Sequence, residues 1–319
     1  MLFFRRILRV VLVLFILLNI SAAFHAYKFT HFYPGTEAKP VAPEKMSWWD
    51  KTKAIVVGVP FAKSVNGPAP DITYNNITLR TEDSVTLEAW YRVQPHPRGT
   101  VILFHGHGAS RSRILAEEQF MFRSGFNTIA VDFRAHGGSA GAVCTIGYNE
   151  AYDVKAAYDF AVKEGAKEVV LWGISLGAAT ISRAMYVFPS VQPSKVIMEM
   201  SFGSLEQAVK GRVRMMGLPE QPVAGLLTFW GGAEQGFWAF DHDPVEYVKN
   251  IKCPVLFQWG INDKRVTRAE TEELFQNCGS KNKKLVEYNE AGHESLYKKE
   301  PAKWEKAVGD FLWSAATSG

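Results

Sequence analysis

Three side chains of the kinds that cooperate in nucleophilic catalysis follow one another along the chain as Ser175, Asp263 and His293. A serine hydroxyl is a weak nucleophile that needs a neighbouring base, and the imidazole of that base needs a third group to hold its tautomer. We therefore expect Ser175 to attack a substrate, His293 to take and return the proton, and Asp263 to orient the imidazole.

The neighbours of Ser175 favour this role. Residues 173–177 read GISLG, which matches the pattern G-x-S-x-G, and they lie between an expected strand over 169–172 and an expected helix over 176–188. In that context the pattern forms a sharp turn that lifts the serine hydroxyl into a cleft. Glycines on either side allow close approach to neighbouring backbone, and the helix N-terminus favours developing negative charge.

Asp263 and His293 each follow an expected strand, over residues 254–259 and 285–288. Open α/β sheets carry their sites at the carboxyl ends of such strands, and the order Ser, Asp, His is the one found with G-x-S-x-G. Glu199, near the end of the strand expected over 195–200, is the alternative acid. Asp132 also follows a strand but precedes the serine, and we expect it to support the turn over 134–141.

A tetrahedral intermediate requires two backbone N–H donors. We expect one from Leu176 and the other from His107, within the segment HGHG that follows the strand over 100–104. A metal held by His105 and His107 is the alternative interpretation, but no carboxylate cluster lies nearby in the sequence. The chemistry expected here requires neither a metal nor an organic cofactor.

The elements that must position these residues alternate between strand and helix from about residue 71 onward. The expected strands cover residues 72–79, 85–93, 100–104, 128–133, 169–172, 195–200, 254–259 and 285–288. The first two form a hairpin, and expected helices over 150–162, 176–188 and 301–313 lie between or after the others. Such alternation predicts an α/β fold with a mostly parallel sheet and helices on both faces.

Over residues 71–315 the chain resembles the α/β-hydrolase superfamily. The resemblance rests on FHGHG at 104–108, DFRAHGGS at 132–139, GISLG at 173–177, GIND at 260–263 and AGH at 291–293. The chain is most similar to bacterial exported or membrane-anchored serine hydrolases with an esterase-like or acyl-peptidase-like core. The resemblance implies an eight-stranded type of sheet with a small cap insertion. The His-Gly-Gly-Gly run of one esterase group is absent.

The cap is expected over residues 204–245, because this connection is longer than one helix requires. Four of its aromatic residues are candidates for an apolar substrate pocket: Phe229, Trp230, Phe237 and Trp238. Glycines among them suit hinges of a lid. The alternative is ordinary packing of an inserted helical pair on the core.

Residues 1–27 form a separate segment in which Arg5, Arg6 and Arg9 precede an apolar run. A signal-anchor would span the membrane with the arginines on the cytoplasmic side, whereas a signal peptide would be cleaved near Ala23. A soluble hydrophobic helix is the third interpretation. The first two place the rest of the chain outside the cytoplasm, periplasmic or extracellular. Residues 28–70, rich in Pro and Gly, are expected to be a linker and an approach segment, and Trp48 and Trp49 indicate that part of it packs on the body. Residues 71–319 are expected to be the hydrolase domain.

The composition excludes several classes of protein. Hydrophobic residues make up 47% of the 319, as in a globular chain, and the net charge of +4 derives mostly from the three arginines before residue 10. The sequence contains no basic stripe interleaved with aromatic residues, which is the pattern that indicates nucleic-acid binding.

We expect a serine hydrolase acting on small esters with an apolar acyl group, with thioesters and amides as related substrates. An exported peptidase and a non-catalytic, membrane-tethered binding protein are the alternatives; oligomeric state is left open.

Overall fold

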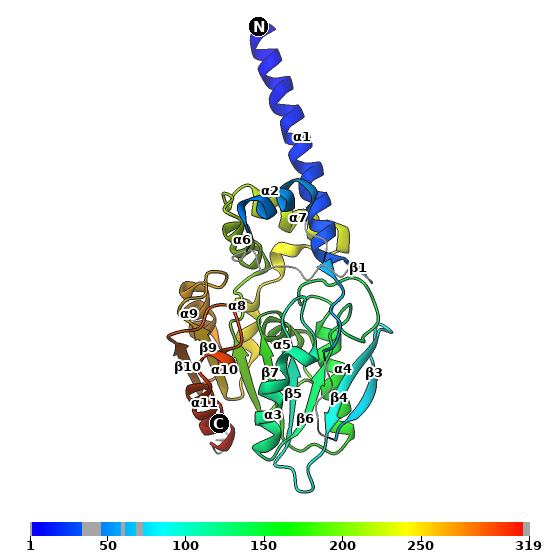
Figure 1. The fold of residues 1–319 in the computed structure, drawn as a ribbon, viewed down its shortest axis with the longest axis vertical. Helices are drawn as coiled ribbons and strands as arrows, with labels where there is room; N and C mark the ends of the chain where they lie inside the picture. Colours follow the sequence, from blue (N-terminus) through cyan, green and yellow to red (C-terminus); the bar gives the residue numbers. More distant parts are fainter. Residues whose placement is uncertain (1, 34–45, 59–60, 68–72, 315–319) are drawn as a thin grey trace.

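A computed structural model describes residues 2–33, 46–58, 61–67 and 73–314. Residue 72, the expected start of the first strand, and part of the expected linker lie outside these residues. Figure 1 shows a sheet flanked by helices, a helical cap on one end of it, and one long helix that projects from the cap. This architecture is the expected α/β-hydrolase fold.

The central sheet has eight strands in the order β10-β9-β8-β7-β5-β6-β4-β3. Strand β4 pairs antiparallel with β3 and β6, and the other neighbours are parallel. The middle strands form because they carry apolar side chains on both faces, as strands covered by two helical layers require. The bounds are β3 (Asn75–Arg80), β4 (Thr86–Arg92), β5 (Thr100–Phe104), β6 (Asn127–Val131), β7 (Val169–Ile174), β8 (Lys195–Glu199), β9 (Val255–Gly260) and β10 (Lys283–Tyr288).

Helices cover both faces of this sheet. On one face α10 contacts both α3 and α11, and on the other α5 contacts α4 and α8, while α8 contacts α9. The bounds are α3 (Leu115–Arg123), α4 (Ala151–Lys163), α5 (Leu176–Val187), α8 (Pro244–Tyr247), α9 (Arg268–Asn277), α10 (Leu296–Lys299) and α11 (Pro301–Trp313). The two layers hold the carboxyl ends of the parallel strands beneath the cap.

The cap contains α6 (Leu205–Met216) and α7 (Val223–Gln235), within the insertion expected over 204–245. It also contains elements from the N-terminal segment. Helix α1 (Leu2–Thr30) contacts α7, and α2 (Trp48–Val57) is hydrogen-bonded to α1. Figure 1 shows α2, α6 and α7 gathered around the base of α1.

The expected boundary after residue 27 is not a break in the structure. Helix α1 runs on to Thr30, because residues 2–33 contain no proline or glycine that would end it earlier. Two short strands follow, β1 (Phe32–Tyr33) and β2 (Phe61–Ala62), which pair in parallel. The described parts of residues 28–70 are therefore built into the folded body.

Candidate active site

The turn between β7 and α5 holds Ser175 in an uncommon backbone conformation, with φ 54° and ψ −111°. A Cβ atom on Gly173 would lie 2.5 Å from the carbonyl carbon of Gly177, and one on Gly177 would lie 2.3 Å from the Phe104 oxygen. Both contacts are with backbone atoms, so a side chain at either position would require the backbone itself to shift. The two glycines of GISLG thus permit the close packing that places Ser175 at the top of the sheet.

The three residues expected to act together are joined by hydrogen bonds. The His293 Nε2 atom lies 3.0 Å from the Ser175 hydroxyl oxygen, and its Nδ1 atom lies 2.7 Å from Oδ2 of Asp263. Because a carboxylate only accepts, Nδ1 carries the hydrogen and Nε2 is left to accept from the serine. The second Asp263 oxygen accepts from the backbone N–H groups of Arg265 and Val266, at 2.8 and 3.0 Å.

Glu199, the alternative acid, has a different environment. Its Oε1 atom accepts from three buried side chains, the indoles of Trp172 (2.9 Å) and Trp304 (2.6 Å) and the amide of Gln258 (2.9 Å). Burial raises the pKa of the Glu199 carboxyl to about 8. Glu199 thus joins β7, β9 and α11 through buried hydrogen bonds, and Asp263 is the acid that contacts the imidazole.

Asp132 supports the turn after β6, as expected from the sequence. Its Oδ1 atom accepts from the backbone of Arg111 at 2.7 Å, and its Oδ2 atom accepts from the backbone of Gly138 at 2.9 Å and from the Asn66 amide at 2.8 Å. These bonds hold the turn and the segment after β5 together.

The loop after β5 passes directly beside Ser175. A Cβ atom on Gly106 would lie 3.7 Å from that of Ser175. The His105 ring donates to the Gly106 carbonyl at 2.8 Å and accepts from the Phe133 N–H at 3.2 Å. Burial lowers the pKa of His105 to about 4, so its ring is neutral and both nitrogens serve the protein backbone.

His107, whose amide is an expected donor, is held by two side chains that no sequence pattern points to. Its ring stacks on Phe29 of α1, with centroids 4.8 Å apart, and its Nδ1 atom accepts from Arg212 of α6 at 3.2 Å. Burial and the nearby guanidinium hold the pKa of His107 well below its ordinary range. Phe29 lies after the N-terminal segment over residues 1–27, and no local pattern links it to His107, 78 residues further along the chain.

A cavity of about 40 Å³ adjoins Ser175 and His293. Its walls are mostly apolar, and α6 contributes to them together with Phe29 of α1 and loops at the carboxyl ends of the strands. The full lining is Phe29, His107, Ile146, Ser175, Leu176, Phe202, Leu205, Ala208, Val209, Arg212, Arg265, Val266 and His293. The charged groups of this lining are two arginines, and no carboxylate belongs to it among the described residues.

The four aromatic residues expected to form the pocket do not line this cavity, which corrects that expectation. Trp230 donates to the Asn19 side chain of α1 at 3.1 Å, and Phe237 stacks on Tyr148 with centroids 4.0 Å apart. Phe229 and Trp238 are exposed on the outer side of the cap. Helix α7 packs on α1, on α6 and on the turn over Ala239–Asp241, whereas α6 is the cap helix that contributes to the cavity lining.

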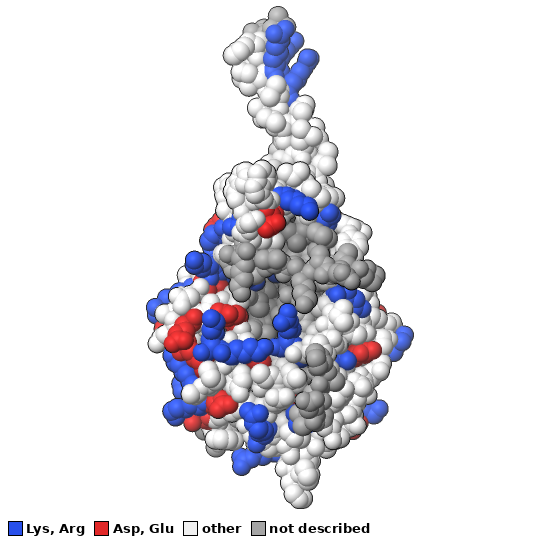
Figure 2. Space-filling model, in the orientation of Figure 1, with Lys and Arg blue, Asp and Glu red and all other residues white. Residues whose placement is uncertain are grey.

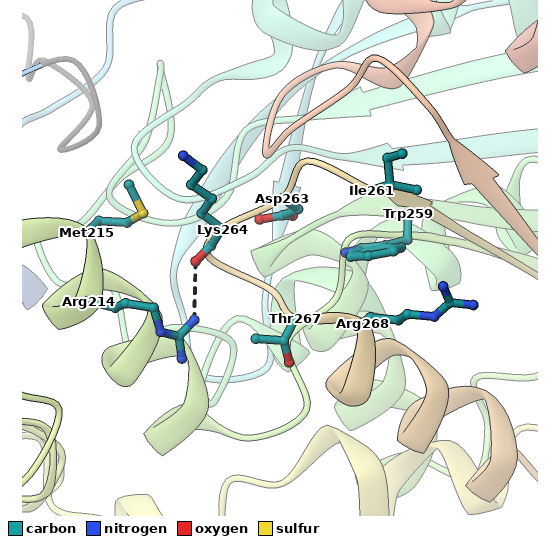
Figure 3. A pocket seen from close by; sticks show the side chains of 8 residues that line it. All are labelled: Arg214, Met215, Trp259, Ile261, Asp263, Lys264, Thr267 and Arg268. Carbon is teal, nitrogen blue, oxygen red and sulfur yellow. Dashed lines mark hydrogen bonds between the residues drawn. The ribbon is translucent and has the colours of Figure 1, made fainter.

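A larger hollow, of about 460 Å³, lies beside the Asp263 loop (Figure 3). The Arg214 guanidinium on its α6 side donates to the Lys264 carbonyl at 3.2 Å. Its lining is Arg214, Met215, Trp259, Ile261, Asp263, Lys264, Thr267 and Arg268. Ser175 and His293 are not in this lining, so the smaller cavity is the one in which the serine and histidine meet.

Comparison with known proteins places the chain among hydrolases. Residues 95–199 match the sequence family described as serine aminopeptidase, S33. Protein bem46 of Schizosaccharomyces pombe is 25% identical over 255 residues, which is 77% of this chain and 80% of that protein. An uncharacterized membrane protein of Saccharomyces cerevisiae is 25% identical over 226 residues, 70% of this chain and 74% of its own length.

Among solved structures, the esterase Pf2001 of Pyrococcus furiosus is similar with a TM-score of 0.63 and 26% identity. The match covers 78% of this chain and 97% of that one. The fold, the sequence family and these neighbours together define a hydrolase. The chain belongs to the α/β-hydrolase superfamily.

Proposed function

We propose that this protein is a serine hydrolase that cleaves carboxylic esters through a covalent acyl-Ser175 intermediate. The observation that carries the proposal is the continuous set of hydrogen bonds from Ser175 through His293 to Asp263, at a cavity with apolar walls. This arrangement gives the hydroxyl a base and gives the base an orienting acid.

In the first half of the reaction the Ser175 oxygen attacks the ester carbonyl carbon while its proton passes to Nε2 of His293. The oxyanion accepts hydrogen bonds from the backbone N–H groups of Leu176 and His107. The Leu176 N–H belongs to the first turn of α5, where no acceptor exists within the helix. When the tetrahedral intermediate collapses, His293 gives the proton to the departing alcohol oxygen and leaves the acyl group on Ser175.

In the second half, water attacks the acyl carbon and gives a proton to His293. The same two N–H groups receive the oxyanion, and the carboxylic acid leaves as Ser175 regains its proton from His293. Asp263 stabilises the imidazolium in both halves and stays ionised. The protein ends in its starting state, with one ester and one water consumed.

A fluorophosphonate probe tests the nucleophile, because it phosphonylates activated serines. The expected result is labelling of the wild-type protein and none of Ser175→Ala. Ser124→Ala, which removes a hydroxyl at the end of α3, is the matched control and should label normally. Equal labelling of Ser175→Ala would reject Ser175 as the nucleophile, and failure of the wild type to label would support the non-catalytic alternative.

A peptidase is the second candidate, favoured by the description of the matching family. An aminopeptidase must hold a positively charged substrate terminus, and carboxylates suit that purpose. Arg212 and Arg265 are the charged groups of the described cavity lining, and they would repel such a terminus. A panel of acyl nitrophenyl esters and aminoacyl amides separates the candidates. Faster turnover of the amides would reject the esterase proposal.

We further propose that α1 anchors the protein in a membrane with the hydrolase body outside the cytoplasm. Residues Phe3–Thr30 are long and apolar enough to cross a bilayer, and the arginines near the start favour the cytoplasmic side. Burial of Ala22 and the hydrogen bond between Asn19 and Trp230, both before the cleavage position, favour retention of the helix over cleavage near Ala23. N-terminal sequencing of the mature protein tests this, and a start near Phe24 would support a cleaved signal peptide.

A further inference from the structure

We propose that the cap rests in the surface of the membrane that holds α1, with α2 and α7 among the lipid headgroups and the upper acyl chains. The partner is the bilayer itself, and the inference rests on the proposed anchoring by α1. Four observations support it: the length of α1, the partners of its polar side chains, the exposed residues of α2 and those around α7.

The first observation is that the free part of α1 is too short to cross a bilayer alone. A spanning helix needs about 20 residues. Counted from Ile7, after the first two arginines, that length ends at Ala26; counted from Val10, after the third, it ends at Phe29. Yet α7 already contacts α1 at Asn19, through the Trp230 indole. The end of the span therefore lies within the cap, so the bilayer must reach the cap helices.

The second observation concerns polar side chains in this stretch of α1, which are costly in hydrocarbon unless they have partners. The Asn19 amide donates to the Phe15 carbonyl at 2.9 Å and accepts from Trp230 at 3.1 Å. The His25 ring contacts the Ile55 carbonyl of α2 at 2.9 Å. Both side chains are thus paired within the protein at the depth where lipid would surround them.

The third observation is the surface of α2. Trp48, Trp49 and Val56 are 68%, 74% and 72% exposed, which is unusual for large apolar side chains. The helix is fixed at the base of α1, because Lys28 donates to the Val57 carbonyl at 2.7 Å. Tryptophans favour the membrane–water interface, where their rings meet apolar chains and their N–H groups meet water.

The fourth observation is that α7 and the turn after it add to the same surface. Phe229 is exposed, and Trp238 is 58% exposed, with their rings 6.1 Å apart. The part of α1 that projects from the cap is called the stalk below. Figure 2 shows basic side chains at its free end and an uncharged surface along it toward the cap. Phe229 and Trp238 lie on α7 and the turn after it, and α7 packs on α1 where that helix enters the cap. A bilayer is the partner that covers both.

Quenching of tryptophan fluorescence by brominated phospholipids tests the proposal. The full chain is reconstituted into phosphatidylcholine vesicles brominated near the headgroup end of the acyl chains, with unbrominated vesicles as reference. The triple variant Trp48→Phe, Trp49→Phe, Trp238→Phe should lose most of the quenchable emission. Trp313→Phe is the matched control: this residue is also 58% exposed but lies on α11, and its removal should leave the quenching unchanged.

Equal quenching of the wild type and the triple variant would overturn the proposal, because the cap would then stand clear of the lipid. Failure of the protein to float with vesicles would overturn it as well, through loss of the anchor. Circular dichroism establishes that the variants are folded. The quenching measures contact with lipid and not hydrolysis, so its outcome is separate from the labelling of Ser175.

Discussion

The backbone of Ser175 depends on two neighbours that have no side chain. Because a Cβ on Gly177 would lie 2.3 Å from the Phe104 carbonyl oxygen, Gly177→Ala must displace either α5 or β5. We expect it to lower Tm and abolish fluorophosphonate labelling. Gly231→Ala in α7 is the control, since its Cβ would meet nothing within 4 Å. Alanine there should raise helix stability by up to about 1 kcal/mol. Full labelling of Gly177→Ala would show that the turn at Ser175 tolerates a side chain at position 177.

Asp263 and Glu199 can be distinguished by changing one carboxyl oxygen in each. Asp263→Asn removes the acceptor that fixes the His293 tautomer, and ester turnover should fall by ~10⁴-fold. Glu199→Gln keeps an oxygen to accept from the Trp172 and Trp304 indoles, so turnover should stay near that of the wild type. Steady-state kcat for a nitrophenyl ester measures both. The reverse ranking would make Glu199 the orienting acid.

The buried Glu199 carboxyl also predicts a dependence of stability on pH. Burial raises its pKa from 4.5 to about 8, so the folded protein holds a proton that the unfolded chain releases between these values. Its contribution to stability is therefore full below about pH 4.5 and is lost as the pH rises toward 8. Wild-type Tm should fall more steeply than that of Glu199→Gln over this range. If the Tm of the two proteins changes with pH in parallel, the Glu199 carboxyl of the folded wild type is already ionised over this range.

Helix α1 contributes a wall of the cavity through Phe29. Phe29→Ala would remove the ring that stacks on His107 and enlarge a cavity of only about 40 Å³. We expect the preference among nitrophenyl esters, measured as kcat/KM against acyl length, to shift toward longer chains, with a lower kcat. Phe24→Ala, on an exposed part of the same helix, should leave the preference unchanged. An identical profile for Phe29→Ala would show that α1 does not shape the site.

The strands and the helices of the body were accessible from sequence because their signals are local. Continuous apolar runs bounded by polar turns placed β5 at residues 100–104, and the apolar face of residues 301–313 placed α11, both with the observed bounds. The positions of Ser175, Asp263 and His293 followed for the same reason, since each comes just after a strand of the sheet.

The residues that line the cavity beside Ser175 could not be predicted from sequence in the same way. Aromatic spacing in α7 indicates an apolar face but not its partner, and the partner is α1, with Trp230 and Asn19 separated by 211 positions. The cap helix that contributes to the cavity wall is instead α6, through small apolar residues such as Ala208 and Val209, which no composition argument selects. Long-range packing between helices decides which residues face the site.

Taken as one molecule, the protein joins an apolar stalk, a cap and a hydrolase body through a single helix. Phe29 lines the cavity from the same helix whose earlier residues are proposed to cross the bilayer. If the cap rests in the bilayer as proposed, an ester dissolved in the membrane would meet the cap at its apolar surface.

This placement predicts that Trp48→Ser with Trp49→Ser reduces hydrolysis of a long-chain ester presented in vesicles, because the cap would bind the interface less closely. Turnover of a water-soluble acetyl ester should remain as in the wild type. Hydrolysis rates measured side by side for the two substrates provide the comparison. A loss of both activities in proportion would indicate damage to the fold and not a change in membrane contact.

The central claim is that Ser175 is the nucleophile, and the most direct measurement is the site of covalent labelling. The protein is treated with a fluorophosphonate, digested and analysed by mass spectrometry. We predict one adduct, on the Ser175 hydroxyl, and its absence from Asp263→Asn over the same short exposure. An adduct on any other residue, or none in the wild type, would contradict the account.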